Sequence, residues 1–344
     1  MHMISIVIPV RNESRHISSV LDKILCQNYP VDSYEVLVVD GESDDSTCEV
    51  VRGYVEGYPD RVRLFSNPKR LSSAARNIGI CNARGELILI IDGHCIIDNL
   101  DMLSNVEVAF GVMLADCLGR PQPLEMGDAT VLQWSIASCR RSLLGHHPDS
   151  HIYSAAGGFV PAISVAVAYR REVFDKVGLF DESFDACEDV ELNYRVDRAG
   201  LRCYFDPKIA VRYVPRRTLS GLAYQMNRYG RGRVRLCQKH PDTFSIKSFG
   251  LGFFAAWLCL FAAASIIYEM SSDRIWCLDY FLRVSGIVMG TYLFVVCAES
   301  LRLALAQRKL LMLIYLPLVF LTIHISFGLG ILQETLAILA KRIR

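Results

Sequence analysis

The chain has 344 residues, so two domains, or one large domain with an appendage, are expected. Its 37 basic and 36 acidic residues leave a net charge of +1, which excludes a nucleic-acid binder that relies on a global positive field. Apolar residues make up 52% of the chain and the 12 cysteines form no CxxC pair, which excludes a disordered chain and argues against a zinc site or a disulfide framework.

Residues 1–215 alternate apolar strands with amphipathic helices. This pattern predicts an α/β domain with a mainly parallel, Rossmann-like sheet that is covered by helices on both faces. Ser46 and Glu49 have the spacing of a capping box that would open one of these helices. The expected strands are 4–10, 35–39, 62–65 and 86–91, and the other expected helices are 14–27 and 72–83.

Polar clusters follow three of the predicted strands: Arg11-Asn12-Glu13, then Asp40, then Asp92-Gly93-His94. Ligands bind at the carboxyl ends of the strands in such sheets, so these clusters predict the binding site. A carboxylate and an imidazole at one strand end can bind Mn²⁺ or Mg²⁺. The alternative roles are local: Asp40 and Asp92 could cap turns, and Glu13 could cap the first helix.

Six sequence blocks in succession carry a resemblance to a known family. The blocks are VIPVRNE, VVDGESDDST, SSAARNIGI, GELILIIDGH, YRREVFDKVGLFDESF and CEDVELNYRVDRAG. Their order and spacing over residues 4–215 resemble family 2 glycosyltransferases, which have the GT-A nucleotide-diphospho-sugar transferase fold. The DGH motif at 92–94, the YGRGR segment at 229–233 and the short hydrophobic tail are most similar to the ExoA-type enzymes of succinoglycan biosynthesis.

The resemblance implies roles for individual residues. Glu188 and Asp189 would be catalytic, with Asp189 as the general base, although a carboxylate at a helix start is also a routine cap. The family's Asp-x-Asp metal motif reads Asp92-Gly93-His94 here, so Asp92 and His94 are the implied ligands of Mn²⁺ or Mg²⁺. Arg76, expected in the first turn of a helix, would bind phosphate, or else form a surface salt bridge. The implied nucleotide-sugar-binding residues are Pro9, Glu13, Asp40, Arg76 and Asp92.

Residues 216–248 form a basic segment next to the membrane, with seven basic residues and no acid between Arg216 and Lys239. The segment could bind anionic lipid headgroups or a lipid diphosphate, or could simply carry juxtamembrane positive charge. Within it, Gln225-x-x-Arg228-Tyr229 is similar to the Gln-x-x-Arg-Trp motif of processive relatives, which implies contact with the acceptor or the diphosphate.

Residues 249–344 predict a membrane domain, with hydrophobic helices at 249–268, 280–298 and 310–333. Three buried helices of a large soluble domain are the alternative. The link with Arg302, Arg308 and Lys309 is more basic than the link with Arg274, which favours a multi-pass protein of the inner (plasma) membrane with a cytoplasmic catalytic domain. The basic C-terminus at 341–344 would then lie outside if the third run crosses. Either residues 336–344 lie along the interface, or the second or third run does not span.

These observations together predict an inverting hexosyltransferase of exopolysaccharide or cell-surface polysaccharide synthesis. The expected donor is a UDP-linked hexose and the expected acceptor is a polyprenyl-diphosphate-linked saccharide. The resemblance to the ExoA-type enzymes further implies UDP-glucose as the donor and a β-1,3 linkage. Membrane lipids and other polysaccharide-assembly proteins are further expected partners, and nucleic acid is not. A polyprenyl-phosphate sugar synthase is one alternative, and a non-catalytic membrane subunit that binds nucleotide sugar is another. His146, His147 and His151 are interpreted as part of a loop over the acceptor site rather than as metal ligands.

Overall fold

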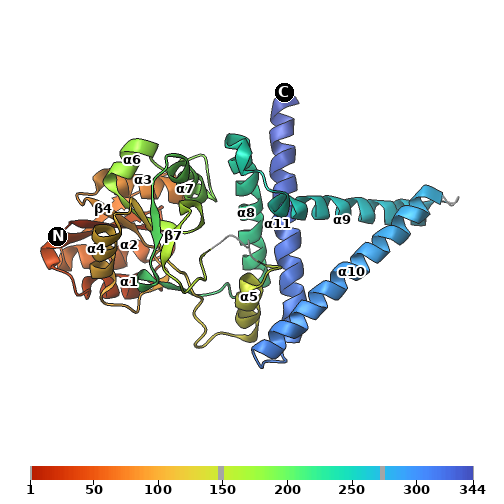
Figure 1. The fold of residues 1–344 in the computed structure, drawn as a ribbon, viewed down its shortest axis with the longest axis horizontal. Helices are drawn as coiled ribbons and strands as arrows, with labels where there is room; N and C mark the ends of the chain where they lie inside the picture. Colours follow the sequence, from red (N-terminus) through yellow and green to blue (C-terminus); the bar gives the residue numbers. More distant parts are fainter. Residues whose placement is uncertain (1, 146–150, 272–275, 344) are drawn as a thin grey trace. The chain divides into compact units, whose positions relative to one another are not determined.

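A computed structural model describes residues 2–145, 151–271 and 276–343, and its chain divides into two compact units (Figure 1). The first unit comprises Met1–Glu125 and Asp149–Val214, and the second comprises Met126–Pro148 and Pro215–Arg344. His146, His147 and Arg274, named above, lie outside the described residues.

The first unit is built on an eight-stranded sheet with the strand order β3-β2-β1-β4-β8-β6-β9-β7. Strands β3, β2, β1 and β4 are mutually parallel, β8 and β7 run antiparallel to their neighbours, and a separate small sheet pairs β5 with β10. This confirms the mainly parallel α/β sheet, and the four predicted strands match β1 to β4 to within one residue at each end. The strands are β1 (Ile4–Val10), β2 (Tyr34–Asp40), β3 (Val62–Ser66), β4 (Leu87–Ile90), β5 (Cys95–Ile96), β6 (Cys117–Gly119), β7 (Gly158–Val160), β8 (Ala166–Arg170), β9 (Cys203–Phe205) and β10 (Arg212–Tyr213).

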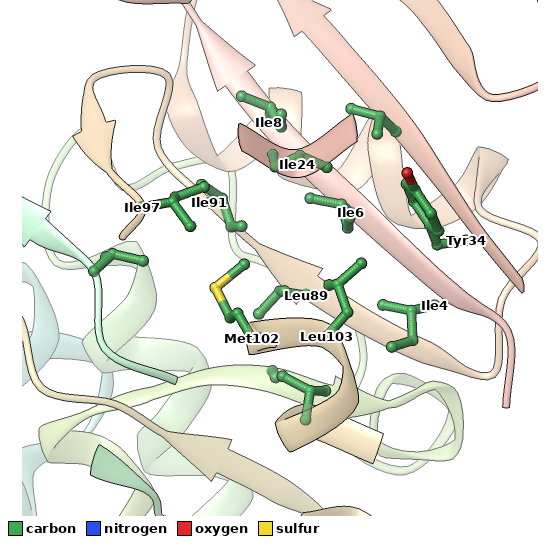
Figure 2. Packing of buried hydrophobic residues seen from close by; sticks show 14 of the residues in the cluster. Ile4, Ile6, Ile8, Ile24, Tyr34, Leu89, Ile91, Ile97, Met102 and Leu103 are labelled. Atoms are coloured by element: carbon green, nitrogen blue, oxygen red, sulfur yellow. The ribbon is translucent and has the colours of Figure 1, made fainter. Parts of the chain in front are cut away.

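Helices cover both faces of this sheet, because side chains alternate along each buried strand. Ile4, Ile6 and Ile8 of β1 pack on one face with residues of α1, α2 and α4, as Figure 2 shows for Ile24, Met102 and Leu103. Val7, between them, points to the other face and packs with residues of α3, α6 and α7. The helices are α1 (Ile17–Leu25), α2 (Thr47–Gly57), α3 (Ser72–Asn82), α4 (Met102–Met113), α6 (Arg171–Val177) and α7 (Glu188–Arg198).

Two local predictions about helix starts need correction. The first helix begins at Ile17 rather than at residue 14, because the backbone carbonyl of Glu13 accepts from His16 and Ile17 in a turn that precedes it. The capping box at α2 is wrong, since the Ser46 side chain makes no capping hydrogen bond. Asp45 accepts from the backbone N–H of Thr47 at 2.9 Å instead, so an earlier acid satisfies a donor of the first turn.

The second unit is helical and contains the three predicted hydrophobic runs. Three of its helices are long and apolar enough to cross a membrane, over Ser248–Met270, Trp276–Ala306 and Met312–Lys341. The short helix α5 also belongs to this unit, because its Ile136 and Cys139 are buried in the same cluster as residues of α8, α10 and α11. The helices are α5 (Val131–Arg141), α8 (Leu219–Lys239), α9 (Ile246–Met270), α10 (Trp276–Ala306) and α11 (Met312–Ile343).

Candidate active site

The three polar clusters meet at one edge of the sheet, as their positions after parallel strands predict. The register of β1 with β2 places Val10 level with Asp40, and the register of β1 with β4 places Val7 level with Ile90. Asp92 follows two residues beyond Ile90. The loops after β1, β2 and β4 therefore share one carboxyl edge in the first unit.

Asp92 is held at this edge by a tyrosine that the sequence did not suggest. The antiparallel pairing of β10 with β5 sets Tyr213 opposite Cys95, and the Tyr213 hydroxyl donates to Asp92 Oδ2 at 2.6 Å. His94 lies edge-on to the Tyr213 ring, with 5.8 Å between centroids. Its Nδ1 lies 2.9 Å from Glu13 Oε1. Glu13 thus orients an imidazole instead of capping α1.

Arg76 joins Asp92 to the acid pair at the start of α7. Its Nη1 lies 3.4 Å from Glu188 Oε1 and its Nη2 lies 3.8 Å from Asp92 Oδ1. The guanidinium also stacks over Phe180, 5.3 Å from the ring centroid. Only 12% of the Arg76 side chain is exposed, so the ion pairs are largely buried and the alternative role, a surface salt bridge, does not apply. One cation therefore lies between the end of β4 and the start of α7.

These contacts shift the pKa values of both acids. Burial raises the pKa of Asp92, but the charges of Arg76 and His94 and the hydrogen bond from Tyr213 outweigh burial, so this pKa is lowered. Burial also raises the pKa of Glu188, and here the charge of Arg76 only partly opposes it. Asp92 is consequently the acid that stays ionised most readily.

Asp189 is exposed in the first turn of α7, beside the buried Glu188. The residue before this pair, Cys187, has a left-handed backbone with φ of 64°. Asp189 Oδ1 accepts from the backbone N–H of Val190 at 2.9 Å, and the N-terminal residue Cys187 makes no side-chain cap. The acid pair is thus presented by a sharp turn, and strain of this kind is common at functional sites.

The other predicted nucleotide residues, Pro9 and Asp40, lie on adjacent strands at the same edge. Asp40 is 5% exposed and accepts from the backbone N–H of Ser43 at 3.0 Å and from the Ser43 hydroxyl at 2.5 Å. Its carboxylate therefore caps the turn after β2, as the alternative role predicted. Pro9 pairs in register with Val39 and is half-buried.

Arg120 is a buried cation that the sequence analysis missed. It is 1% exposed, directly follows β6, and donates from Nη2 to the Ile90 carbonyl at 3.2 Å. In the part of the chain that the structure describes, its Nε and Nη1 have no hydrogen-bond partner. Burial is the main influence on the pKa of Asp92, and Arg120 is one of the cations that oppose it. A basic residue immediately after a short apolar strand was the available signal.

The three predicted acceptor residues lie on α8, in the second unit, and contact residues of this helix and of the segment before it. Gln225 Nε2 donates to the Tyr229 hydroxyl at 3.1 Å and Gln225 Oε1 accepts from Arg216 Nε at 3.5 Å. The Arg228 guanidinium lies over the Tyr224 ring, 5.8 Å from its centroid. These contacts gather a basic and aromatic surface on one helix.

Asp92 and His94 are the candidate ligands of a divalent cation. No group of three or more His, Cys, Asp or Glu side chains arranged to hold a metal occurs among residues 2–145, 151–271 and 276–343. A pair of protein ligands nevertheless fits a cation that takes its other ligands from a substrate diphosphate. The carboxylate of Glu13 against His94 Nδ1 also matches the partner that fixes a metal-binding imidazole, which would make Nε2 the ligating nitrogen.

Comparison with known proteins identifies the family. The glycosyltransferase-like family 2 model matches residues 2–232. The succinoglycan biosynthesis protein ExoA of Rhizobium meliloti is 34% identical over 239 residues, covering 68% of this chain and 70% of the relative. A dolichyl N-acetyl-alpha-D-glucosaminyl phosphate 3-beta-D-2,3-diacetamido-2,3-dideoxy-beta-D-glucuronosyltransferase of Methanococcus voltae is 25% identical over 339 residues, covering 95% of this chain and 96% of the relative.

Among solved structures, the mannosyltransferase PcManGT from Pyrobaculum calidifontis, in complex with GDP-Man and Mn²⁺, has the same fold. It aligns with a TM-score of 0.60 at 17% identity, over 97% of this chain and 87% of that one. The fold is therefore GT-A, a Rossmann-like sheet followed here by apolar helices that could span a membrane. With a family model over two thirds of its length, the chain belongs to glycosyltransferase family 2 and is an enzyme of polysaccharide biosynthesis.

Proposed function

We propose that this enzyme transfers glucose from UDP-glucose to a polyprenyl-diphosphate-linked saccharide, with inversion at the anomeric carbon. The observation that carries the proposal is the position of Arg76. Its guanidinium contacts Asp92, the candidate metal ligand, and Glu188, the neighbour of the candidate base. The group proposed to stabilise the leaving diphosphate and the acid pair that contains the proposed base thus lie around one side chain.

In this proposal Asp189 is the base. It takes the proton from the acceptor hydroxyl while that oxygen attacks the anomeric carbon, and the bond from this carbon to the diphosphate oxygen breaks on the opposite face. A single displacement inverts the configuration, so an α-linked donor yields a β-linkage. Exposure of Asp189 at the first turn of α7 leaves it accessible to an incoming hydroxyl.

The leaving diphosphate carries the charge that the site must stabilise. Mn²⁺ or Mg²⁺ held by Asp92 and His94 would neutralise part of this charge. Arg76 binds the diphosphate from the side of α3, and Tyr213 keeps the Asp92 carboxylate oriented. Asp40, Pro9 and Glu13 then line the edge at which the nucleoside binds, and Glu13 also sets the imidazole of His94.

The acceptor and linkage rest on the relatives. The Methanococcus voltae enzyme is named as acting on a dolichyl-phosphate-linked sugar and forming a 3-beta linkage, and ExoA is named for succinoglycan biosynthesis. These names support a lipid-linked saccharide, a β-1,3 linkage and a role in exopolysaccharide assembly. Gln225, Arg228 and Tyr229 of α8 are the candidate contacts of the acceptor diphosphate. We place the catalytic domain on the cytoplasmic side of the inner membrane, from the distribution of basic residues in the links.

Donor screening tests this proposal. The full chain in nanodiscs is given Mn²⁺, a polyprenyl-diphosphate saccharide extract, and labelled UDP-glucose, UDP-galactose or GDP-mannose, and the lipid product is analysed for its linkage. We expect transfer from UDP-glucose into a β-1,3-linked product. Transfer from another donor, or another linkage, would overturn that part of the proposal.

Asp189→Asn tests the base. We expect transfer to fall about 10²–10⁴-fold with donor binding retained. Asp175→Asn is the matched control, since Asp175 is an exposed aspartate on α6. If Asp189→Asn is as active as the control, the acceptor is a group that needs no base, which would favour a polyprenyl-phosphate sugar synthase.

A further inference from the structure

The apolar helix α11 is paired over its middle part with α8, which is too basic to lie in hydrocarbon. α8 contains four arginines and a lysine between Arg228 and Lys239, and its sequence includes no acid. Each such charge costs about 2.5–3.5 kcal/mol at the centre of a bilayer. The depth of α8 therefore limits the depth of any helix packed closely beside it.

Close backbone contact ties the two helices together. A Cβ added to Gly230 of α8 would lie 2.1 Å from the Phe327 carbonyl oxygen, and one added to Gly330 of α11 would lie 2.1 Å from the Asn227 carbonyl oxygen. Asn227 Nδ2 also donates to Gln333 Oε1 at 3.0 Å. The helices therefore touch at their backbones, and Figure 1 shows α8 and α11 side by side.

Charge pairing and an apolar groove extend this contact in both directions. Towards the end of α8, Arg231 Nε and Arg235 Nε donate to the Glu334 carboxylate at 2.9 and 2.8 Å. Towards its start, Leu219 and Leu318 line a shared groove of about 420 Å³. The pairing thus covers residues 318–334 of α11, or about 25 Å at 1.5 Å per residue. That is most of a hydrocarbon core about 30 Å thick.

Helix α9 also approaches the backbone of α11, over a shorter stretch than α8 does. It meets α11 at its own start, where a Cβ added to Gly328 would lie 2.1 Å from the Leu251 carbonyl oxygen, and then leaves across it (Figure 1). α9 also contacts α10, where Trp257 Nε1 donates to Ser285 Oγ at 3.2 Å. In the most apolar stretches of α9, α10 and α11, 17%, 11% and 39% of residues are buried. α9 and α10 thus present apolar surface nearly all round, as lipid-facing helices do.

We propose that α9 and α10 form the membrane-spanning hairpin, and that α8 and α11 lie together on the membrane surface as a binding platform for anionic lipid headgroups. Three complete spans would draw the arginines of α8 into hydrocarbon, whereas a surface-lying α11 leaves them at the headgroups. The C-terminus then lies on the same side of the membrane as the catalytic domain. This arrangement also places the basic residues 302, 308, 309, 341 and 342 on one side, which removes the conflict with the positive-inside rule.

Epitope tags on the full chain test the arrangement. One tag is placed at the N-terminus, one at the C-terminus and one within the link at residues 272–275, and each is probed with antibody in sealed vesicles of both orientations. We expect the two terminal tags to react on one side and the link tag on the other. A C-terminal tag that reacts with the link tag indicates three spans and overturns the proposal, and three tags on one side overturn the hairpin.

A matched pair of lysine substitutions provides a second measurement. Ile287 of α10 is 70% exposed in the hairpin, and Leu329 lies near the middle of α11. We expect Ile287→Lys to lower the carbonate-resistant membrane fraction about tenfold or more, and Leu329→Lys to change it less than twofold. Equal losses would overturn the proposal. The assignment to the cytoplasmic side rests on the proposed function, but the tags report only which segments share a side. Repeating the tag experiment on the Asp189→Asn variant, which the proposed function expects to be inactive, separates a failure of the membrane arrangement from a failure of the proposed function.

Discussion

Replacing Arg76 by methionine removes the cation shared by two acids. The Arg76 side chain is 12% exposed, and those of its partners Glu188 and Asp92 are 11% and 32% exposed. Removing one partner of a buried ion pair costs about 3–5 kcal/mol. Asp92 retains solvent contact and the hydrogen bond from Tyr213, so we expect the lower end of this range, about 3 kcal/mol.

The loss of stability in Arg76→Met should depend on pH, and both acids should make it larger as the pH rises. Burial raises the pKa of Glu188 in the folded protein, so its contribution to stability is present at low pH and is lost as pH rises through that value. Without Arg76 this pKa rises further and the cost at neutral pH grows. Asp92 has a lowered pKa, for which burial is outweighed by Arg76, and it stabilises the fold above its unfolded value. Without Arg76 that gain shrinks. The stability deficit of Arg76→Met should therefore be larger at pH 8 than at pH 5.

The assay is urea unfolding of the detergent-solubilised full chain at both pH values, read by limited proteolysis of the first unit, together with UDP-glucose binding. Arg63→Met is the matched control, because Arg63 Nη2 pairs with Glu35 Oε2 at 2.7 Å and the Glu35 side chain is 2% exposed. Both variants should lose stability, but only Arg76→Met should lose donor affinity, by about tenfold or more. A deficit that is equal at both pH values or larger at pH 5, or an equal loss of affinity in the control, would refute the reasoning.

Three further outcomes are expected. Tyr213→Phe removes the 2.6 Å hydrogen bond that helps to lower the pKa of Asp92, so the acidic limb of the kcat/KM profile should move to higher pH, and an unchanged limb would contradict the role given to Tyr213. Gly79→Ala sets a Cβ 2.3 Å from Val7 Cγ1 and should destabilise the first unit by about 1–3 kcal/mol. Gly53→Ala, where the added Cβ has nothing within 4 Å, should stabilise this unit by up to about 1 kcal/mol. Changes of the same sign in the free energy of unfolding would count against the packing argument. Chelation with EDTA should abolish transfer and Mn²⁺ should restore it, whereas full activity in EDTA would exclude a cation-dependent enzyme.

Much of the first unit could be predicted because its determinants are local. Apolar residues spaced for burial on both faces defined β1 to β4, and polar residues directly after those strands had to meet at one edge once the strands were parallel. The position of Asp92 at this edge follows from chain order alone. Cap details were less predictable, as α2 shows: Asp45, Ser46 and Thr47 all compete for the same N–H groups, and small differences in backbone geometry decide between them.

The partners of the site residues depended on long-range contacts. Tyr213 and Asp92 are 121 residues apart in the sequence and meet only because β10 pairs with β5. No periodicity in the sequence predicts that pairing. Strands β4 and β6 lie on either side of β8 and run in the same direction, so their carboxyl ends lie at the same edge of the sheet. Arg120, which follows β6, can therefore donate to the Ile90 carbonyl at the end of β4. The contact of Arg76 with Glu188 likewise requires α3 and α7 to cover the same face of the sheet.

The sequence alone determined that this chain has a parallel α/β domain, a cluster of acids at its strand ends, and three runs of apolar residues, because burial period and run length are properties of neighbouring residues. Tertiary structure decided which charges face one another and which apolar helix packs on the basic α8. Hydropathy makes α9, α10 and α11 alike, whereas the close packing of Gly230 and Gly330 and the ion pairs of Glu334 with Arg231 and Arg235 join α11 to α8.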